Sequence, residues 1–126
     1  KHKILCTGDM CVNGAFNYMG HSNSAGWIKC LEAMEKLDID LICPGHGKVA
    51  RKDLLATQRR YFADLRAHVQ KGIDGKKSVA EITDSLNLPW YKAWTGVAAN
   101  ETDMLKGNVK HVYDELTGKI DHDRLG

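Results

Sequence analysis

Residues 38–48 of the chain read Asp38-Ile39-Asp40-Leu41-Ile42-Cys43-Pro44-Gly45-His46-Gly47-Lys48. An apolar run typical of a β-strand ends in Pro-Gly, and a histidine follows between two glycines, where no bulky neighbour blocks the approach to its side chain. In an open α/β sheet, ligands and metals collect in the loops that follow the carboxyl ends of the strands. The pattern therefore makes His46 a candidate site residue. The alternative is a histidine that only occupies a tight turn.

A second short strand pattern lies at the start of the chain. Residues 3–9 read Lys-Ile-Leu-Cys-Thr-Gly-Asp, an apolar run that ends in a glycine followed by a carboxylate. One helical pattern separates the two runs, which predicts the order strand, helix, strand. If the strands are parallel and joined by a right-handed crossover, their carboxyl ends meet at one edge of the sheet. Asp9 and His46 would then lie at the same rim and form half of a zinc or iron site.

Length and composition indicate an ordinary globular protein of about one domain. The chain has 126 residues, of which 43% are hydrophobic and 27% are charged, and its net charge is +2. The mixed signs and the lack of a clustered Lys/Arg face argue against a nucleic-acid partner and against a helix-turn-helix protein. No apolar run approaches the roughly 20 residues of a membrane span. We therefore expect a cytoplasmic protein with no membrane partner.

The sequence contains four cysteines: Cys6, Cys11, Cys30 and Cys43. They fall inside predicted strands or a predicted helix, and no Cys-x-x-Cys spacing occurs, so buried reduced thiols are expected rather than a zinc ribbon. One alternative is a site built from Cys6, Asp9, Cys43 and His46, because each cysteine precedes its partner by three residues. Strand side chains alternate between faces, and this argues against that alternative.

Helical periodicity accounts for most of the remaining sequence. It predicts a helix capped by Ser22 or Ser24 that includes 27–37, a helix over 51–71, a helix opened by a Ser78–Glu81 capping box and ending near Asn87, and a helix from Glu101 or Asp103 to Leu116. Trp90, Tyr91 and Trp94 are predicted to lie in a short turn that is rich in aromatic residues.

Taken together, these motifs resemble the C-terminal half of a metallo-β-lactamase-fold hydrolase. The resemblance is carried by Cys6-Thr7-Gly8-Asp9, by Gly26-Trp27 at the start of an amphipathic helix, by Pro44-Gly45-His46-Gly47, and by a helical tail with Ser78-Val79-Ala80-Glu81 and Tyr113-Asp114-Glu115-Leu116. It implies an α/β fold in which residues 1–50 form a strand-helix-strand half of a four-layer αββα sandwich. Residues 51–126 would form a helical C-terminal extension that packs on that half.

The resemblance also implies a chemistry, which is metal-assisted hydrolysis. It implies that Asp9 bridges two metal ions and that His46 completes the shell of the second metal. The family motif His-x-His-x-Asp-His has no match here: His2 and His21 are isolated, and His68, His111 and His122 fall in helices or the tail. We therefore expect the isolated chain to be inactive, because it supplies only part of a di-metal site.

A missing N-terminal half or a second copy of the chain would have to supply the other ligands. Zinc, or alternatively iron or manganese, is expected to bind only when those ligands are present. The completed site would then act on a small molecule, and thioesters, lactones, lactams and phosphodiesters are all handled within this superfamily. The alternative function is a non-catalytic interaction module that keeps the half fold and associates with itself.

Overall fold

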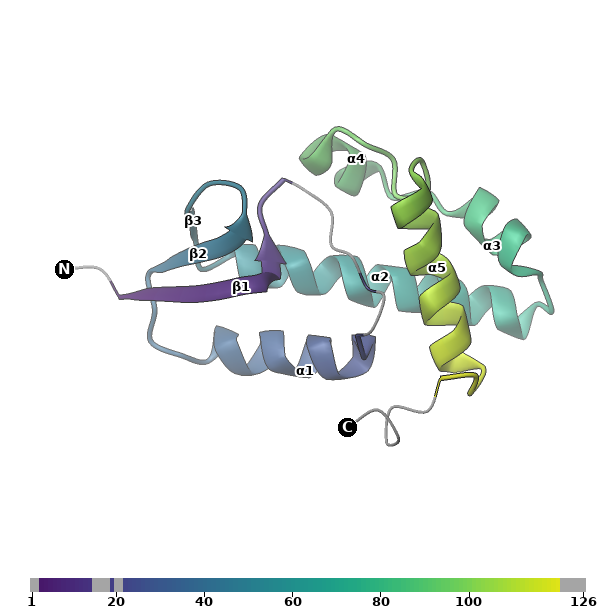
Figure 1. Cartoon of the computed structure of the whole chain (residues 1–126), viewed down its shortest axis with the longest axis horizontal. Coiled ribbons are helices and arrows are strands. Elements are labelled where there is room, and N and C mark those ends of the chain that lie inside the picture. The colour runs from purple at the N-terminus through teal and green to yellow at the C-terminus, as the bar shows by residue number, and fades with distance from the viewer. Residues whose placement is uncertain (1–2, 15–18, 20–21, 121–126) are drawn as a thin grey trace. The chain divides into compact units, whose positions relative to one another are not determined.

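The computed structural model describes residues 3–14, 19 and 22–120, and these residues form a mixed α/β structure with three strands and five helices (Figure 1). In chain order the elements are β1 (Ile4–Val12), α1 (Ser24–Glu35), β2 (Leu41–His46), β3 (Ala50–Arg51), α2 (Leu54–Asp74), α3 (Val79–Ser85), α4 (Pro89–Thr95) and α5 (Asp103–Leu116). The predicted α/β class is therefore confirmed. None of the helices in the described residues combines the length and the apolar character needed to cross a membrane.

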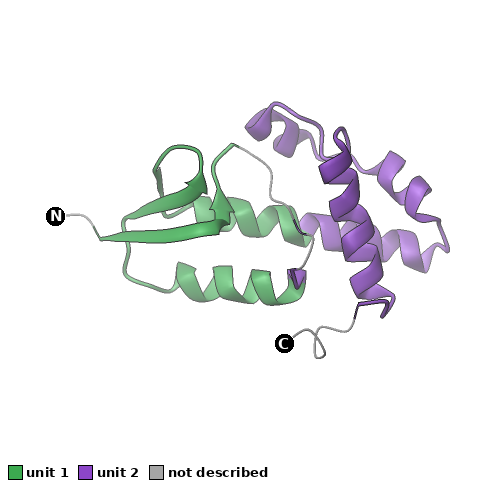
Figure 2. Cartoon of the chain, in the orientation of Figure 1, with its two compact units in different colours: residues 1–17, 25–63 green, residues 18–24, 64–126 purple. Residues whose placement is uncertain are grey.

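The chain divides into two compact units, which Figure 2 shows in green and purple. Unit 1 holds residues 1–17 and 25–63, and unit 2 holds residues 18–24 and 64–126. The sheet and nearly all of α1 belong to unit 1, together with the first part of α2. The rest of α2 and the helices α3 to α5 belong to unit 2.

The sheet of unit 1 has the strand order β1-β2-β3. β1 and β2 are parallel, with Leu5 opposite Ile42, which confirms the predicted strand, helix, strand arrangement. β3 pairs with β2 in the antiparallel direction, and Ala50 lies opposite Ile42. This short third strand was not predicted. It explains why α2 begins at Leu54, after the predicted start, because the residues at 50 and 51 are extended.

Both long strands continue past the glycines that were expected to end them. β1 runs through Gly8 to Val12, and β2 runs through the Pro-Gly pair to His46. The prediction was wrong here because each strand finds a hydrogen-bonding neighbour along the extended stretch, and this pairing outweighs the local turn propensity of glycine and proline. The candidate residues Asp9 and His46 therefore lie on strands and not in loops.

One face of the sheet packs against helices of unit 1. Ile42 is fully buried on this face. Trp27 of α1 donates a hydrogen bond from Nε1 to the carbonyl oxygen of Met10 at 3.0 Å. Gln58 of α2 accepts one from the backbone nitrogen of Val12, also at 3.0 Å. These two bonds attach both helices to β1.

The opposite face of the sheet is accessible, and we call it the open face. It is formed by Ile4, Cys6, Leu41 and Cys43, which occupy paired positions on β1 and β2 and alternate with the covered residues. Ile4 is 57% exposed, Cys6 is exposed, and the other two are half-buried. The burial that was predicted for all four cysteines is confirmed only for Cys11, because Cys30 is also exposed.

The helices of unit 2 follow the predicted signals closely. Ser78 caps α3 by accepting a hydrogen bond from the backbone nitrogen of Glu81, and Glu81 accepts one from the backbone nitrogen of Ser78, both at 3.2 Å. α5 begins at Asp103 and ends at Leu116, as predicted. The aromatic turn was a wrong prediction, because residues 89–95 form α4, which starts with a proline suited to a first helical turn.

Candidate metal site at the carboxyl ends of the strands

Asp9, three residues before the end of β1, and His46, the last residue of β2, lie beside each other. The Oδ1 atom of Asp9 is 3.4 Å from the Nε2 atom of His46. The side chains are 81% and 69% exposed, so both can be reached from solvent. The predicted proximity of the two residues is confirmed, whereas their role as metal ligands stays a prediction.

An irregularity in β1 accounts for the position of Asp9. Cys6 lies opposite Cys43 and Gly8 lies opposite Pro44, so β1 has advanced further than β2 over the same interval. Extra residues of this kind bulge a strand and redirect the side chains that follow. Gly8 has a φ of 55°, which is a left-handed conformation that glycine adopts more readily than other residues.

Gly45 allows the two strands to approach each other at the site. A Cβ atom at this position would collide with Oδ1 of Asp9 and would lie 2.7 Å from the carbonyl carbon of Gly8 and 2.8 Å from the backbone nitrogen of Asp9. Such contacts are too short for real Cβ atoms. A glycine is therefore required at position 45 for space, and this close approach sets Asp9 next to His46.

Asn13 holds the segment that carries His46. Its backbone nitrogen donates to the carbonyl oxygen of His46 at 2.9 Å, and its Nδ2 atom donates to the carbonyl oxygen of Lys48 at 3.0 Å. A Cβ atom at Gly47, where φ is 94°, would lie 2.9 Å from Cβ of Asn13. Sequence reasoning did not single out Asn13, because no short-range pattern connects an asparagine to partners more than thirty residues away.

The ligand set within the described residues is small. None of the described His, Cys, Asp and Glu side chains forms a group of three or more that could hold a metal ion. The alternative site of Cys6, Asp9, Cys43 and His46 is therefore not assembled. The pair Asp9 and His46 is what remains of the predicted site.

The other described histidines are engaged within unit 2. His68 Nε2 lies 2.9 Å from the carbonyl oxygen of Ile82, and His111 Nε2 lies 2.7 Å from the carbonyl oxygen of Ser22. A carbonyl oxygen only accepts hydrogen bonds, so each of these contacts places a hydrogen on Nε2. His2, His21 and His122 lie outside the described residues.

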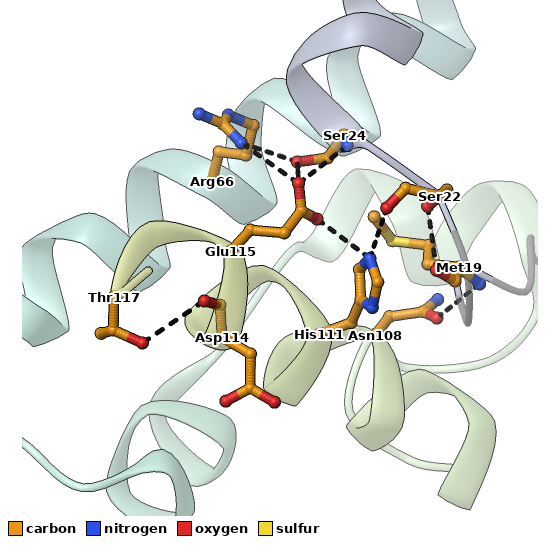
Figure 3. A network of polar contacts seen from close by, with 9 residues as sticks. All are labelled: Met19, Ser22, Ser24, Arg66, Asn108, His111, Asp114, Glu115 and Thr117. Atoms are coloured by element: carbon orange, nitrogen blue, oxygen red, sulfur yellow. Dashed lines mark hydrogen bonds and ion pairs between the residues drawn. The ribbon is translucent and has the colours of Figure 1, made fainter. Parts of the chain in front are cut away.

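Unit 2 contains a second carboxylate and imidazole pair, which Figure 3 shows within a larger polar network. Glu115 Oε1 lies 3.2 Å from His111 Nε2, and these side chains are 5% and 9% exposed. Glu115 Oε2 accepts hydrogen bonds from the backbone nitrogen and the hydroxyl of Ser24 at 2.9 and 3.1 Å. Arg66 donates to the same hydroxyl at 2.7 Å. This cluster ties α5 to α2 and to the first residue of α1.

Comparisons with known proteins do not assign the chain to a family. No protein-family model matches it, and a search of curated proteins finds no match. The resemblance to the metallo-β-lactamase fold therefore depends on the motifs, and the site geometry has to be weighed on its own chemistry.

Proposed function

We propose that the chain is the C-terminal portion of a metal-dependent hydrolase of the metallo-β-lactamase superfamily, in which Asp9 and His46 supply part of a di-metal site. The observation that carries the proposal is that Asp9 Oδ1 and His46 Nε2 lie 3.4 Å apart on side chains that are 81% and 69% exposed. Two ligand atoms at about 2.1 Å from a tetrahedral zinc ion lie about 3.4 Å apart. The spacing of the two side chains therefore fits two ligands of one metal ion.

The chemical nature of the two side chains also fits. Asp9 offers two carboxylate oxygens and so can contact two metal ions, and His46 offers an imidazole nitrogen. A bound metal would supply a water with a lowered pKa and would polarise the bond under attack. The chain's own residues hold these ligands: Gly45 keeps the space that Asp9 needs, and Asn13 holds the segment around His46.

The ligand count indicates that the site needs further residues. A catalytic zinc takes about three protein ligands and a water, whereas this pair supplies two. The missing ligands would come from an N-terminal half, whose sheet would cover the open face and complete the αββα sandwich. The substrate class stays open among thioesters, lactones, lactams and phosphodiesters, and the metal among zinc, iron and manganese.

The alternative function is a non-catalytic module that associates with itself. The accessible apolar side chains Ile4 on the open face and Val49 beside β3 favour it, with exposures of 57% and 56%. A second copy could cover this surface in place of an N-terminal half. Light scattering at micromolar concentration tests the module. The module is supported if the chain forms a dimer without zinc and if adding an N-terminal half does not dissociate that dimer. A monomer that stays monomeric on dilution excludes the module.

The metal proposal is tested by zinc titration in a calorimeter, alongside hydrolysis of a thioester and of a lactone. We expect weak zinc binding and no hydrolysis for the chain alone, and both properties to appear together when an N-terminal half is added. Asp9→Ala and His46→Ala should then abolish both, because each removes a ligand. Asp38→Ala is a matched control, since its side chain is 85% exposed and the residue precedes the amino end of β2.

One result would overturn the proposal. Tight stoichiometric zinc binding by the chain alone that neither Asp9→Ala nor His46→Ala changes would place the metal elsewhere.

A further inference from the structure

Cys6 and Cys43 face each other across the two parallel strands. Their Cα atoms are direct partners in the register of β1 and β2, so both side chains project from the open face. Cys6 is exposed and Cys43 is half-buried. Two sulfur atoms are thus held side by side on an accessible surface.

The spacing of the strands permits a covalent link between these residues. Neighbouring strands lie about 4.8 Å apart, and disulfide-bonded residues have Cα separations of about 4.4–6.8 Å. No displacement of the backbone is needed to bring Cys6 and Cys43 into this range. A disulfide that is exposed or strained is also easily reduced again.

We propose that Cys6 and Cys43 form a redox-active dithiol, which a hydroperoxide converts reversibly into a disulfide between β1 and β2. In the first step the sulfur of one cysteine attacks the O–O bond, which forms a sulfenic acid and releases an alcohol, or water from hydrogen peroxide. In the second step the other thiol displaces the hydroxyl group, which leaves as water and forms the S–S bond. The two thiols lose two electrons and two protons, and the hydroperoxide is reduced.

The surroundings of the two cysteines assign the steps. The charge of the neighbouring Cys6 raises the pKa of Cys43 above its ordinary value of 9.0. The more exposed Cys6 is the residue that attacks the hydroperoxide, and Cys43 is the residue that forms the disulfide.

The remaining cysteines serve as internal controls. Cys11 is fully buried, and burial raises its pKa to about 11, so it is a poor nucleophile at neutral pH. Cys30 is exposed on α1 and tests whether exposure alone is enough for oxidation. The inference applies to the chain with its open face uncovered, and it does not depend on Asp9 and His46 being metal ligands.

The test is peptide mapping of the whole chain after oxidation. The reduced protein is treated with one equivalent of hydrogen peroxide, alkylated, and cleaved before aspartate under non-reducing conditions. The sequence then yields Cys6 in peptide 1–8 and Cys43 in peptide 40–52, whereas peptide 9–37 contains both other cysteines. We expect a linked pair of peptides 1–8 and 40–52, which dithiothreitol separates. Full alkylation of both peptides after oxidation would overturn the proposal.

Substitutions then separate the two roles. In Cys43→Ser the sulfenic acid on Cys6 cannot be resolved, so we expect it to accumulate and to react with dimedone. In Cys6→Ser we expect neither the sulfenic acid nor the disulfide. Cys30→Ser is the matched control for an exposed cysteine, and it should form the disulfide as the unsubstituted chain does. A disulfide that forms mainly through Cys30 would overturn the proposal even if a substituted chain failed to fold.

Discussion

Two pairs of a carboxylate and an imidazole occur among the described residues, and they differ most in their surroundings. Asp9 and His46 are 3.4 Å apart at the rim of the sheet and are 81% and 69% exposed. Glu115 and His111 are 3.2 Å apart in unit 2 and are 5% and 9% exposed. The distance between the two groups is similar in both pairs, so distance alone does not separate a ligand pair from a structural pair.

The partners around each pair explain the difference. Glu115 accepts two hydrogen bonds from Ser24, and His111 contacts the carbonyl oxygen of Ser22. Buried charges are tolerated only when such partners replace water, so this pair is part of the packing of unit 2. The side chains of Asp9 and His46 are mostly exposed at the rim of the sheet. An incoming metal ion could therefore reach them without breaking the fold.

The largest effect is expected from Glu115→Ala. This change leaves His111 and Arg66 without the carboxylate at a buried position, and we expect it to lower the free energy of unfolding by about 3–5 kcal/mol. Urea denaturation followed by circular dichroism measures the loss. Glu115→Gln keeps the volume and one acceptor and should cost less. A loss of under about 1 kcal/mol for the alanine variant would mean that the network contributes no more than a typical single hydrogen bond.

The next effect concerns the close approach at the rim. Gly45→Ala forces a Cβ atom against Asp9, and overpacking of this kind costs about 1–3 kcal/mol. The same shift should separate Asp9 from His46 and reduce zinc binding in the completed site. Gly107→Ala in α5 is the matched control, because a Cβ atom there would meet open space, so a gain of about 0.5–1 kcal/mol is expected. Equal effects of the two variants would contradict the proposed role of Gly45.

Local signals in the sequence were enough for the parts of the fold that depend on neighbouring residues. The capping box at Ser78 and the bounds of α5 follow from residues that lie within a few positions of each other. Pairing with strands that are distant in the sequence determines β3 and the ends of β1 and β2. Local propensities contain no information on such pairing. α4 was not predicted because its closely spaced aromatic residues were interpreted as a turn, although Pro89 is suited to the first turn of a helix.

The candidate site was predicted in part for the same reason. Asp9 and His46 stand next to glycines at the ends of two apolar runs, and that local pattern was visible. The contributions of Asn13 and Gly45 depend on contacts between β1 and the region around β2, which only the register establishes. The register also places Cys6 opposite Cys43. The alternation of side chains along a single strand does not indicate which residues of two strands are paired.

A smaller effect is expected at the N-terminus of α3, where an exposed carboxylate is a capping residue and not a metal ligand. Glu81 is exposed, yet its pKa is lowered by the hydrogen bonds to the backbone and side chain of Ser78. Because the folded pKa lies below the unfolded one, the contribution to stability is present above about pH 4.5 and is lost as the pH falls through the folded value. Ser78→Ala should cost about 1 kcal/mol at pH 7 by removing the cap.

The measurement for the cap is a series of urea denaturations between pH 3 and pH 7. We expect the stability difference between Ser78→Ala and the unsubstituted chain to shrink toward the acidic end, because Glu81 is then protonated in both. Ser85→Ala is a control at the other end of α3, where the hydroxyl donates to the carbonyl oxygen of Ile82. If the stability difference between the two proteins grew as the pH fell, the predicted direction of the pH dependence would be wrong.

The smallest effect on stability is expected at the rim itself. Asp9→Ala and His46→Ala remove exposed side chains, so each should change the free energy of unfolding by no more than about 0.5 kcal/mol, as Asp38→Ala should. The same two variants should abolish zinc binding once an N-terminal half completes the site, and Asp38→Ala should not. The comparison with Glu115 requires that Asp9 and His46 affect metal binding and leave folding unchanged. If Asp9→Ala destabilised the chain as much as Glu115→Ala, both pairs would be structural and the metal proposal would lose its basis.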